Sequence, residues 1–308
     1  MSLLVYMIAY LTVIVFISAV LYRFISYLRN PMHIRWELYP VPHEGKRASY
    51  GGSYMEEVDW WKKPRKKSRI NELKVMAEEI MLLKGVLDNN RPLWYLTYPF
   101  HLGLYLLGAF IALLVVGAIA QIAGVSIGPL TAFTKLIGVA GFILGLIGAV
   151  GLFWRRFADS SIRNYSSFEH FFNLSLFIIT IGVGILTWLF VDPNFNMAGT
   201  FVANLISFNL APIKSQLFLV QILLASLLIA YIPLTHMSHF FMKYFLYHDI
   251  RWGDEPNVNN PATQAKIAAV LNYPVTWAAP HIAGHGKHTW AEVATFNPAA
   301  EPEKPKKE

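Results

Sequence analysis

Long uncharged runs separated by short polar stretches dominate the pattern of the first 241 residues. Residues 3–22 contain no charge, and 43 uncharged residues lie between Arg91 and Lys135. A helix needs about 20 apolar residues to cross roughly 30 Å of hydrocarbon. The turn-forming stretch at residues 124–129 divides the long run into two helices. The pattern therefore predicts an all-α integral membrane protein built as a bundle of five transmembrane helices.

We expect these helices at residues 3–22, 99–123, 130–154, 170–191 and 216–241. Residues 193–213 are also uncharged, but this stretch contains four asparagines and two prolines. Because these residues are unfavourable in a membrane span, we interpret the stretch as a connecting loop with a short interfacial helix.

The basic residues are distributed unevenly along this pattern. With five spans, every Lys and Arg except Lys135 and Lys214 falls on one side of the membrane. The positive-inside rule then places the N-terminus outside and the C-terminus in the cytoplasm, as in a multi-pass protein of the cytoplasmic (inner) membrane. The net charge of +7 is thus a topology signal and does not require a nucleic-acid partner. The first span has no signal-peptide features and is expected to stay uncleaved.

Composition narrows the possible chemistry. Hydrophobic residues make up 55% of the chain and charged residues 15%, which fits a protein embedded in the lipid bilayer. The chain has no cysteine. This excludes disulfides, thiolate zinc sites, iron–sulfur ligation by this chain and covalent haem attachment. A redox metal would have to be held by His, Met or carboxylate groups.

Four segments follow from this organisation: residues 1–25 as the first span, 26–97 as a cytoplasmic loop, 98–241 as the other four spans, and 242–308 as a cytoplasmic tail. Apolar residues recur at helical spacing from Ile70 to Leu87, which predicts an amphipathic helix that covers the bundle or binds a partner. The tail, which is rich in Trp and Pro, is expected to be an extended docking strip with a disordered end.

Ionisable residues in membrane spans are costly and are usually functional. Here they are His101, His170, His236 and His239, and all four fall near the same side of the predicted bundle. Imidazole is a good ligand of haem iron, and two axial ligands must lie at matching depth on opposite sides. His101 and His239 have this matching depth. His236, one turn deeper, is an alternative partner for His101, and Pro233 is expected to kink the helix nearby.

Other interpretations of these residues remain open. The histidines could be solvated at the membrane interface, or they could contact the substrate of a transporter or channel. Arg155 and Arg156 end the third span on the same side. They are suited to pair with haem propionates, but they are equally suited to anchor the helix at lipid phosphates.

Two motifs carry a family resemblance: Phe100-His-Leu-Gly-Leu104 and Tyr231-Ile-Pro-Leu-Thr-His-Met-Ser-His239. They resemble motifs of the five-helix cytochrome b subunits typified by the gamma subunit of respiratory nitrate reductase. The resemblance implies haem b with His101 and His239 as its ligands. The same pattern has a second, outer haem, but its ligand positions are Ile111 and Gln221 here. His170 and His236 remain as ligands of a second iron or as groups at a quinone pocket.

Residues 50–61, 90–94 and 275–281 resemble one branch of this family more closely. That branch comprises the membrane cytochromes of the sulfite-reduction-associated (Dsr) complex, the Hdr-like menaquinol oxidoreductase (Hme) and the transmembrane cytochrome (Tmc) complexes. It implies electron exchange between the menaquinone pool and a cytoplasmic iron–sulfur subunit resembling heterodisulfide reductase (HdrD-like). It also implies a multihaem cytochrome c as a further partner and a role in sulfur metabolism. His236 or His170 would exchange protons with the quinol.

Overall fold

The computed structural model describes residues 1–29, 57–59, 62–63, 69–125, 128–239, 261–279, 282–283 and 285–296 of the 308-residue chain. The chain divides into two compact units. The first consists of Met1–Arg23 and Met76–His239, and the second of Phe24–Val75 and Phe240–Glu308. Most of the 50–61 motif, the end of the fifth predicted span at residues 240–241, and the final residues 301–308 lie outside the described residues.

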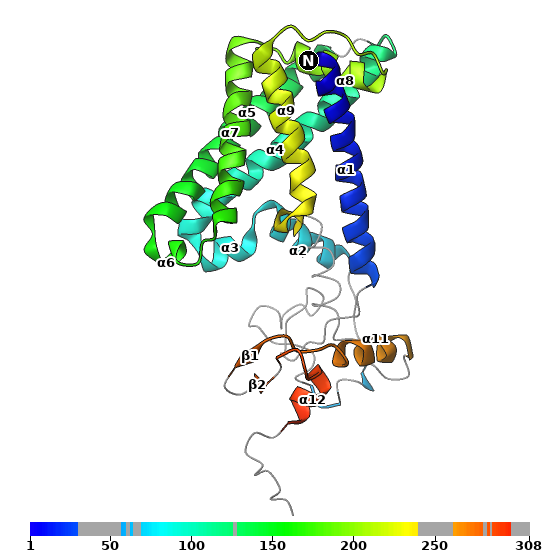
Figure 1. Ribbon diagram of the computed structural model, residues 1–308, viewed down its shortest axis with the longest axis vertical. Helices are drawn as coiled ribbons and strands as arrows, with labels where there is room; N and C mark the ends of the chain where they lie inside the picture. The colour runs from blue at the N-terminus through cyan, green and yellow to red at the C-terminus, as the bar shows by residue number, and fades with distance from the viewer. Residues whose placement is uncertain are drawn as a thin grey trace, which may run out of the picture. The chain divides into compact units, whose positions relative to one another are not determined.

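The five predicted spans are confirmed as helices. In the described part of the chain, five helices are long and apolar enough to cross a membrane. Figure 1 shows them side by side in the first unit. They are α1 (Ser2–Arg29), α4 (Arg91–Ile122), α5 (Gly128–Ala158), α7 (Phe168–Phe190) and α9 (Gln216–Tyr231), and for α9 the apolar stretch continues to Leu234.

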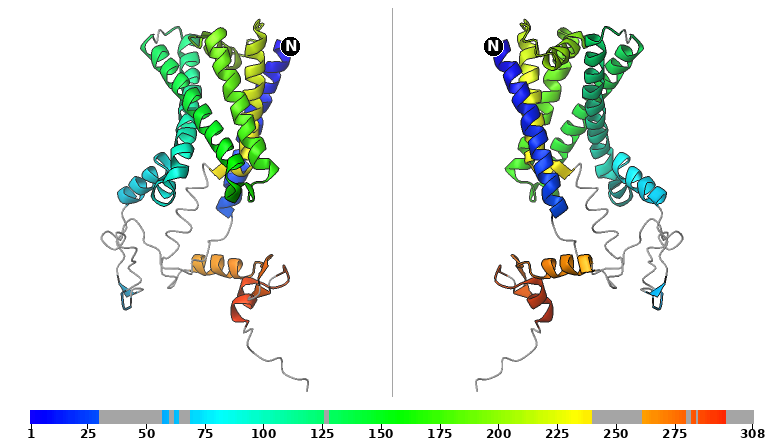
Figure 2. Two further views of the ribbon diagram at one scale, coloured as in Figure 1. Left: turned by 90° about the vertical axis from the view of Figure 1, so that its left-hand side faces the viewer. Right: turned by 90° about the vertical axis from the view of Figure 1, so that its right-hand side faces the viewer.

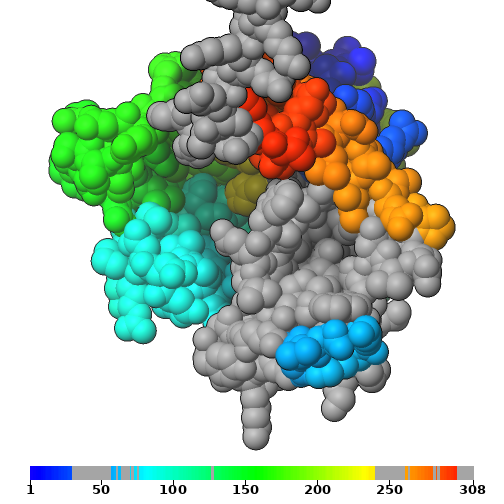
Figure 3. Space-filling model, turned by 90° about the horizontal axis from the view of Figure 1, so that it is seen from below, coloured from blue at the N-terminus to red at the C-terminus, as the bar shows by residue number. Residues whose placement is uncertain are grey.

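Two connections at opposite ends of the bundle each contain one short helix. The link between α5 and α7 contains α6 (Ser160–Arg163), and in the view of Figure 3 its green surface adjoins the cyan surface around the start of α4. The stretch at residues 193–213 contains α8 (Asn196–Ile206), as predicted for a loop with a short helix. The N-terminus and α8 lie at the end of the bundle opposite α6 (Figure 1).

The prediction of one continuous amphipathic helix from Ile70 to Leu87 is wrong. It is divided into α2 (Arg69–Met81) and α3 (Lys84–Asn89) because Leu83 adopts the left-handed conformation, with φ of 49°. The side chain of Leu73, on the predicted apolar face, is 62% exposed. A side chain of α4 contacts the residues between α2 and α3. Nε1 of Trp94 donates a hydrogen bond to the carbonyl of Leu82 at 2.7 Å.

Helix α4 begins eight residues earlier than the sequence pattern indicated. The side chain of Asn90 accepts a hydrogen bond from the backbone N–H of Leu93 at 3.1 Å, and Pro92 follows in the first turn. Both features favour the start of a helix. Aromatic side chains occupy the added turns, and Trp94 stacks on Tyr98 with ring centroids 4.6 Å apart.

The prediction that the fifth helix continues to residue 241 is also wrong. Helix α9 ends at Tyr231, and two 3₁₀ turns follow, Ile232–Leu234 and His236–Ser238. Pro233 has no backbone N–H to continue the helical ladder, and Thr235 between the turns is extended. We expected Pro233 to kink the helix, and its effect is stronger than that, because the α-helix ends there.

The closest packing in the bundle joins α4 and α5 through glycines. A Cβ atom on Gly103 of α4 would overlap the backbone of Gly145, and one on Gly148 of α5 would overlap the backbone of Phe100. Small residues let two helix backbones approach in a membrane, where apolar burial alone does not drive association. The contact therefore depends on the absence of side chains at these positions.

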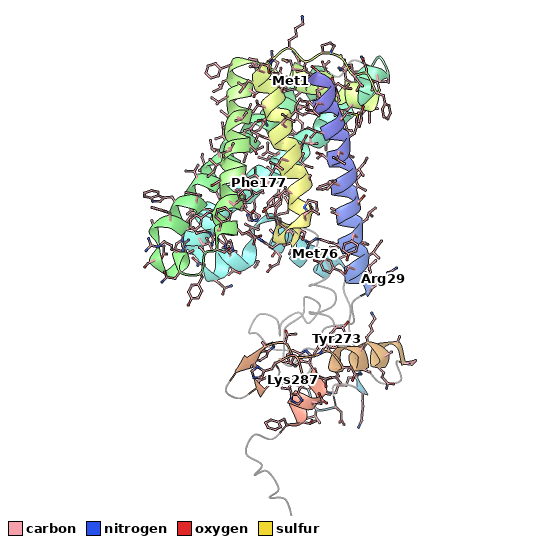
Figure 4. The ribbon with its side chains drawn as sticks, in the orientation of Figure 1. Met1, Arg29, Met76, Phe177, Tyr273 and Lys287 are labelled. Atoms are coloured by element: carbon pink, nitrogen blue, oxygen red, sulfur yellow. The ribbon has the colours of Figure 1, made fainter. Side chains whose placement is uncertain are left out.

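Aromatic residues fill the space between this helix pair and α7. The ring of Phe177, labelled in Figure 4, is 4% exposed and lies 5.1 Å from the ring of Phe100 in an edge-to-face arrangement. Ile181, one turn further along α7, is 2% exposed and faces Gly145 of α5. The backbone position of Phe100 is thus fixed from two sides.

The described tail residues form short elements rather than the fully extended strip we predicted. They are α11 (Pro261–Leu271), the antiparallel strands β1 (Ala278–Ala279) and β2 (Ile282–Ala283), and α12 (Trp290–Thr295). Trp277 and Trp290 make an edge-to-face contact with centroids 6.4 Å apart, and both remain partly exposed.

We expect Gly148→Ala to destabilise the bundle by about 1–3 kcal/mol, because the new methyl group forces α4 and α5 apart. The control is Gly108→Ala on α4, where the added Cβ would meet no atom within 4 Å among the described residues, apart from its chain neighbours and the backbone of its own helix. That change should be neutral or slightly stabilising, since alanine favours a helix over glycine. Thermal unfolding of the detergent-solubilised protein measures both, and equal midpoints for the two variants would contradict the packing argument.

Candidate functional site

All four histidines singled out in the sequence lie at one end of the bundle, which we call the histidine end. His101 is the eleventh residue of α4, and His170 is the third residue of α7. His236 and His239 follow the break after α9. The structure brings them together as two separate pairs rather than as one cluster, and no group of three or more metal-binding side chains is found among the described residues.

The first pair is His101 and His239, whose ring centroids are 6.1 Å apart with 60° between the ring planes. Nδ1 of His101 lies 2.9 Å from the carbonyl oxygen of Thr97. A carbonyl can only accept, so Nδ1 carries the proton and Nε2 keeps its lone pair. Nδ1 of His239 makes a longer contact, 3.4 Å, with the carbonyl of His236. Both rings are thus held as metal-binding histidines usually are.

This geometry fits two axial ligands of one metal ion. Imidazole nitrogens bind metals at about 2.0–2.1 Å, so two rings on opposite sides of one ion have centroids roughly 6 Å apart. The donor set, two neutral imidazoles without carboxylate or thiolate, is the set that holds haem iron in cytochromes b. The residues present therefore fit a haem.

The second pair is His170 and His236, with ring centroids 5.8 Å apart. Its hydrogen bonds differ. The backbone N–H of Ser167 donates to Nδ1 of His170 at 3.0 Å, so the proton of the neutral ring is on Nε2. Nδ1 of His236 lies 2.9 Å from Oε1 of Glu169. In this state His170 offers a hydrogen-bond donor rather than a metal-binding lone pair.

Glu169 is the residue of this group that the sequence analysis missed. Its side chain is 51% exposed and that of His236 is 55% exposed, so both reach the surface of the histidine end. The available signal was an acidic residue directly before a span that begins with His. Without the position of His236, 67 residues away, that signal does not separate Glu169 from an ordinary acidic residue in a helix's first turn.

A partly buried polar contact lies one turn further into the bundle. The hydroxyl of Tyr231 donates to Oδ1 of Asn173 at 2.9 Å, which joins α9 to α7 just before α9 ends. The amide Nδ2 of Asn173 is buried without a partner among the described residues. This pair was also missed, because neither residue is ionisable near neutral pH.

The two arginines at the end of α5 differ in their surroundings. Arg156 donates from Nη1 to the hydroxyl of Ser166 at 2.8 Å and so holds the turn before α7. Nη1 of Arg155 is buried and has no hydrogen-bond partner in the described part of the chain. A buried cationic N–H without a partner is costly, which suits Arg155 rather than Arg156 to an anionic ligand.

The two positions of an outer haem site do not face each other. Ile111 is 46% exposed on the outside of α4. Gln221 lies inside the bundle, where its amide is against Gly184 of α7 and its Oε1 is buried without a partner in the described region. Neither side chain replaces an imidazole, in agreement with the sequence comparison.

A hollow of about 540 Å³ lies at the opposite end of the bundle, between α4, α5 and α8. Polar groups of Gln121, Thr134 and Asn196 line it together with apolar residues. It contains none of the four histidines and is not part of this site.

Comparison with known proteins identifies the family. The model of the nitrate reductase gamma subunit family matches residues 86–252, which contain all four histidines. No curated protein matches the chain significantly. No solved structure does so either. Because the family match covers more than half of its 308 residues, the chain belongs to the nitrate reductase gamma subunit family, whose members are haem b-binding membrane subunits of multisubunit electron-transfer complexes.

Proposed function

We propose that this chain carries one haem b between His101 and His239 and exchanges electrons between menaquinone or menaquinol and a cytoplasmic iron–sulfur subunit. The observation that carries the proposal is the first histidine pair, with 6.1 Å between the ring centroids and Nδ1 of His101 bound to the Thr97 carbonyl. These features suit the two side chains to hold a haem iron, because the ring spacing would leave room for one ion and the tautomer leaves a lone pair on Nε2 of His101.

The haem, when bound, supplies one-electron transfer between the quinone pool and the soluble partner. The protein's residues fix its position. The carbonyl of Thr97 orients the ring of His101, and the packing of Phe100 on α5 and α7 fixes the backbone beside it. Arg155 is seven residues after Gly148, on the same face of α5 and about 10 Å further along the helix. We assign Arg155 to a haem propionate.

The second histidine pair is assigned to the quinone headgroup. Nε2–H of His170 is a donor for a quinone oxygen, and the His236–Glu169 pair can accept or give the proton that accompanies each electron. Quinone chemistry needs both a hydrogen-bond donor and a titratable group. The pair therefore supplies proton exchange at the same end of the bundle as the proposed haem.

We infer the orientation of the chain in the membrane from its charge distribution, and its partners from the family branch that it resembles. The distribution of Lys and Arg supports a cytoplasmic location for the histidine end, in the inner membrane with the N-terminus outside. The resemblance to the Dsr, Hme and Tmc cytochromes supports an HdrD-like iron–sulfur subunit and a multihaem cytochrome c as partners. The partly exposed Trp277 and Trp290 suit a docking role for the tail.

We expect a dithionite-reduced minus air-oxidised spectrum of the purified chain to show a b-type haem at about one per polypeptide. His101→Ala and His239→Ala should each abolish it, because each removes an axial ligand. His170→Ala and His236→Ala serve as matched controls and should retain the haem. A colourless protein purified with its partners would instead favour a transporter that uses these histidines as substrate contacts.

The proton-exchange assignment predicts a different effect for the second pair. His170→Gln and Glu169→Gln should slow haem reduction by a menaquinol analogue by roughly 10²-fold, the usual contribution of a positioned acid or base. The dithionite-reduced spectrum should stay unchanged. Stopped-flow measurements on membranes that contain the full complex test this, and unaltered rates in both variants would rule the assignment out.

Arg155→Gln should lower the haem midpoint potential by roughly 60 mV, a factor of ten for a one-electron couple. Removing a nearby positive charge stabilises the ferric state relative to the ferrous state. Arg163→Gln, in the exposed α6 turn, is the charge-matched control and should leave the potential unchanged. Redox titration of both variants measures this difference. Equal midpoint potentials in the two variants would show that Arg155 binds another anion.

A further inference from the structure

We propose that Arg23 of α1 is a positioning residue for His239, because its guanidinium holds the broken segment that follows α9. The inference rests on the proposed role of His239 as a haem ligand. Its structural part, that Arg23 fixes this segment, stands on the contacts below and can be tested without haem.

The segment cannot hold itself in place as a helix does. The last α-helical hydrogen bond runs from the N–H of Ile232 to the carbonyl of Leu228, and the two 3₁₀ turns that follow are separated at Thr235, whose φ and ψ are −113° and −177°. Within the segment, the N–H of Ser238 donates to the carbonyl of Thr235 at 3.2 Å. Short 3₁₀ turns have poorer hydrogen-bond geometry than an α-helix. Contacts from outside the segment are therefore needed to fix its direction.

Arg23 provides such contacts to both turns. Its Nη2 donates to the carbonyl of Leu234 at 2.9 Å, and its Nη1 donates to the hydroxyl of Ser238 at 3.1 Å. Ser238 is completely buried, and His239 is the next residue. A shift of Ser238 would therefore move His239 away from the 6.1 Å ring spacing it has with His101.

Helix α1 is itself anchored to the bundle, so Arg23 acts from a fixed base. Figure 2 shows α1 (blue) alongside α9 (yellow) in both side views. Thr12 donates to the carbonyl of Ser226 in α9 at 3.3 Å, and Tyr10 donates to the carbonyl of Leu205 at 2.9 Å. Tyr6 is 1% exposed and stacks on Phe201.

The geometry is specific to arginine. The two acceptors lie four residues apart and are reached by two nitrogens of one planar fork, which a lysine ammonium cannot reproduce. An arginine that only anchored α1 at the lipid headgroups would direct its charge to lipid phosphate and would not bind two protein acceptors. The contacts therefore favour a positioning role.

The first experiment uses the absence of native cysteine. In full-length protein, Ser238→Cys introduces one thiol, and its labelling by a membrane-permeant maleimide reports whether the buried position opens. We expect slow labelling with Arg23 intact and labelling roughly tenfold faster or more with Arg23→Gln, because the charge-assisted hydrogen bond to the Leu234 carbonyl, which the Ser238→Cys reporter leaves in place, is lost. Arg23→Lys should be intermediate. Arg29→Gln, at the end of the same helix, is the control for lost charge, and equal rates in all variants would overturn the proposal.

The second experiment reads the ligand directly. In the complex with haem, Arg23→Gln should keep the haem but change the ferric electron paramagnetic resonance signal and the midpoint potential, because the ring of His239 is no longer held. Arg29→Gln should match the wild type. Faster labelling with an unchanged haem signal would show that His239 is not the ligand and would overturn the positioning role. Absence of haem from the wild-type complex would overturn the proposed function, whereas labelling would still decide whether Arg23 holds the segment.

Discussion

The glycine contact between α4 and α5 is the constraint on which the rest of the bundle depends. Because Gly148 has no side chain, the backbone of Phe100 lies directly against α5, and Phe177 of α7 closes the other side of its ring. The residue after Phe100 is His101. In a membrane, where dispersion and close approach take the place of the hydrophobic effect, such small residues let two helix backbones approach closely. The position of His101 thus follows from glycine and phenylalanine residues that have no reactive or metal-binding groups.

The end of α9 has a different physical cause, which is the hydrogen bond that Pro233 cannot donate. It also determines where two of the histidines lie. In a continuous helix, His236 and His239 would lie about 60° apart on one face and would compete for the same partner. Because Pro233 ends the helix, His239 lies near His101 and His236 lies near His170 and Glu169. One proline therefore separates two histidine pairs that a regular helix would have placed together. The freed segment then depends on contacts from another helix, and Arg23 supplies two of them.

Much of this arrangement could be predicted from the sequence, and the failures have a common cause. Hydropathy and length identified the five spans and the loop around α8, and matched depth singled out His101 and His239. The sequence did not reveal the turn at Leu83, the pairing of Glu169 with His236, or the hydrogen bonds of Arg23 with the segment after α9. Each of these depends on a partner or a backbone conformation set by tertiary packing. Periodicity reports which face of a helix is apolar, but it does not report which distant carbonyl or carboxylate a polar side chain meets.

The two histidine pairs show how helix position alone can give one residue type two different chemistries. His101 lies in a helix interior, where the nearest backbone group is the carbonyl of Thr97, and a carbonyl forces the proton onto Nδ1. His170 lies in the first turn of α7, where backbone N–H groups have no helical partner, and that of Ser167 forces the proton onto Nε2. One ring is left with a lone pair for a metal and the other with a donor for an oxygen atom. The electron transfer and the proton exchange that we propose for the histidine end would therefore use the same residue type in two different tautomers.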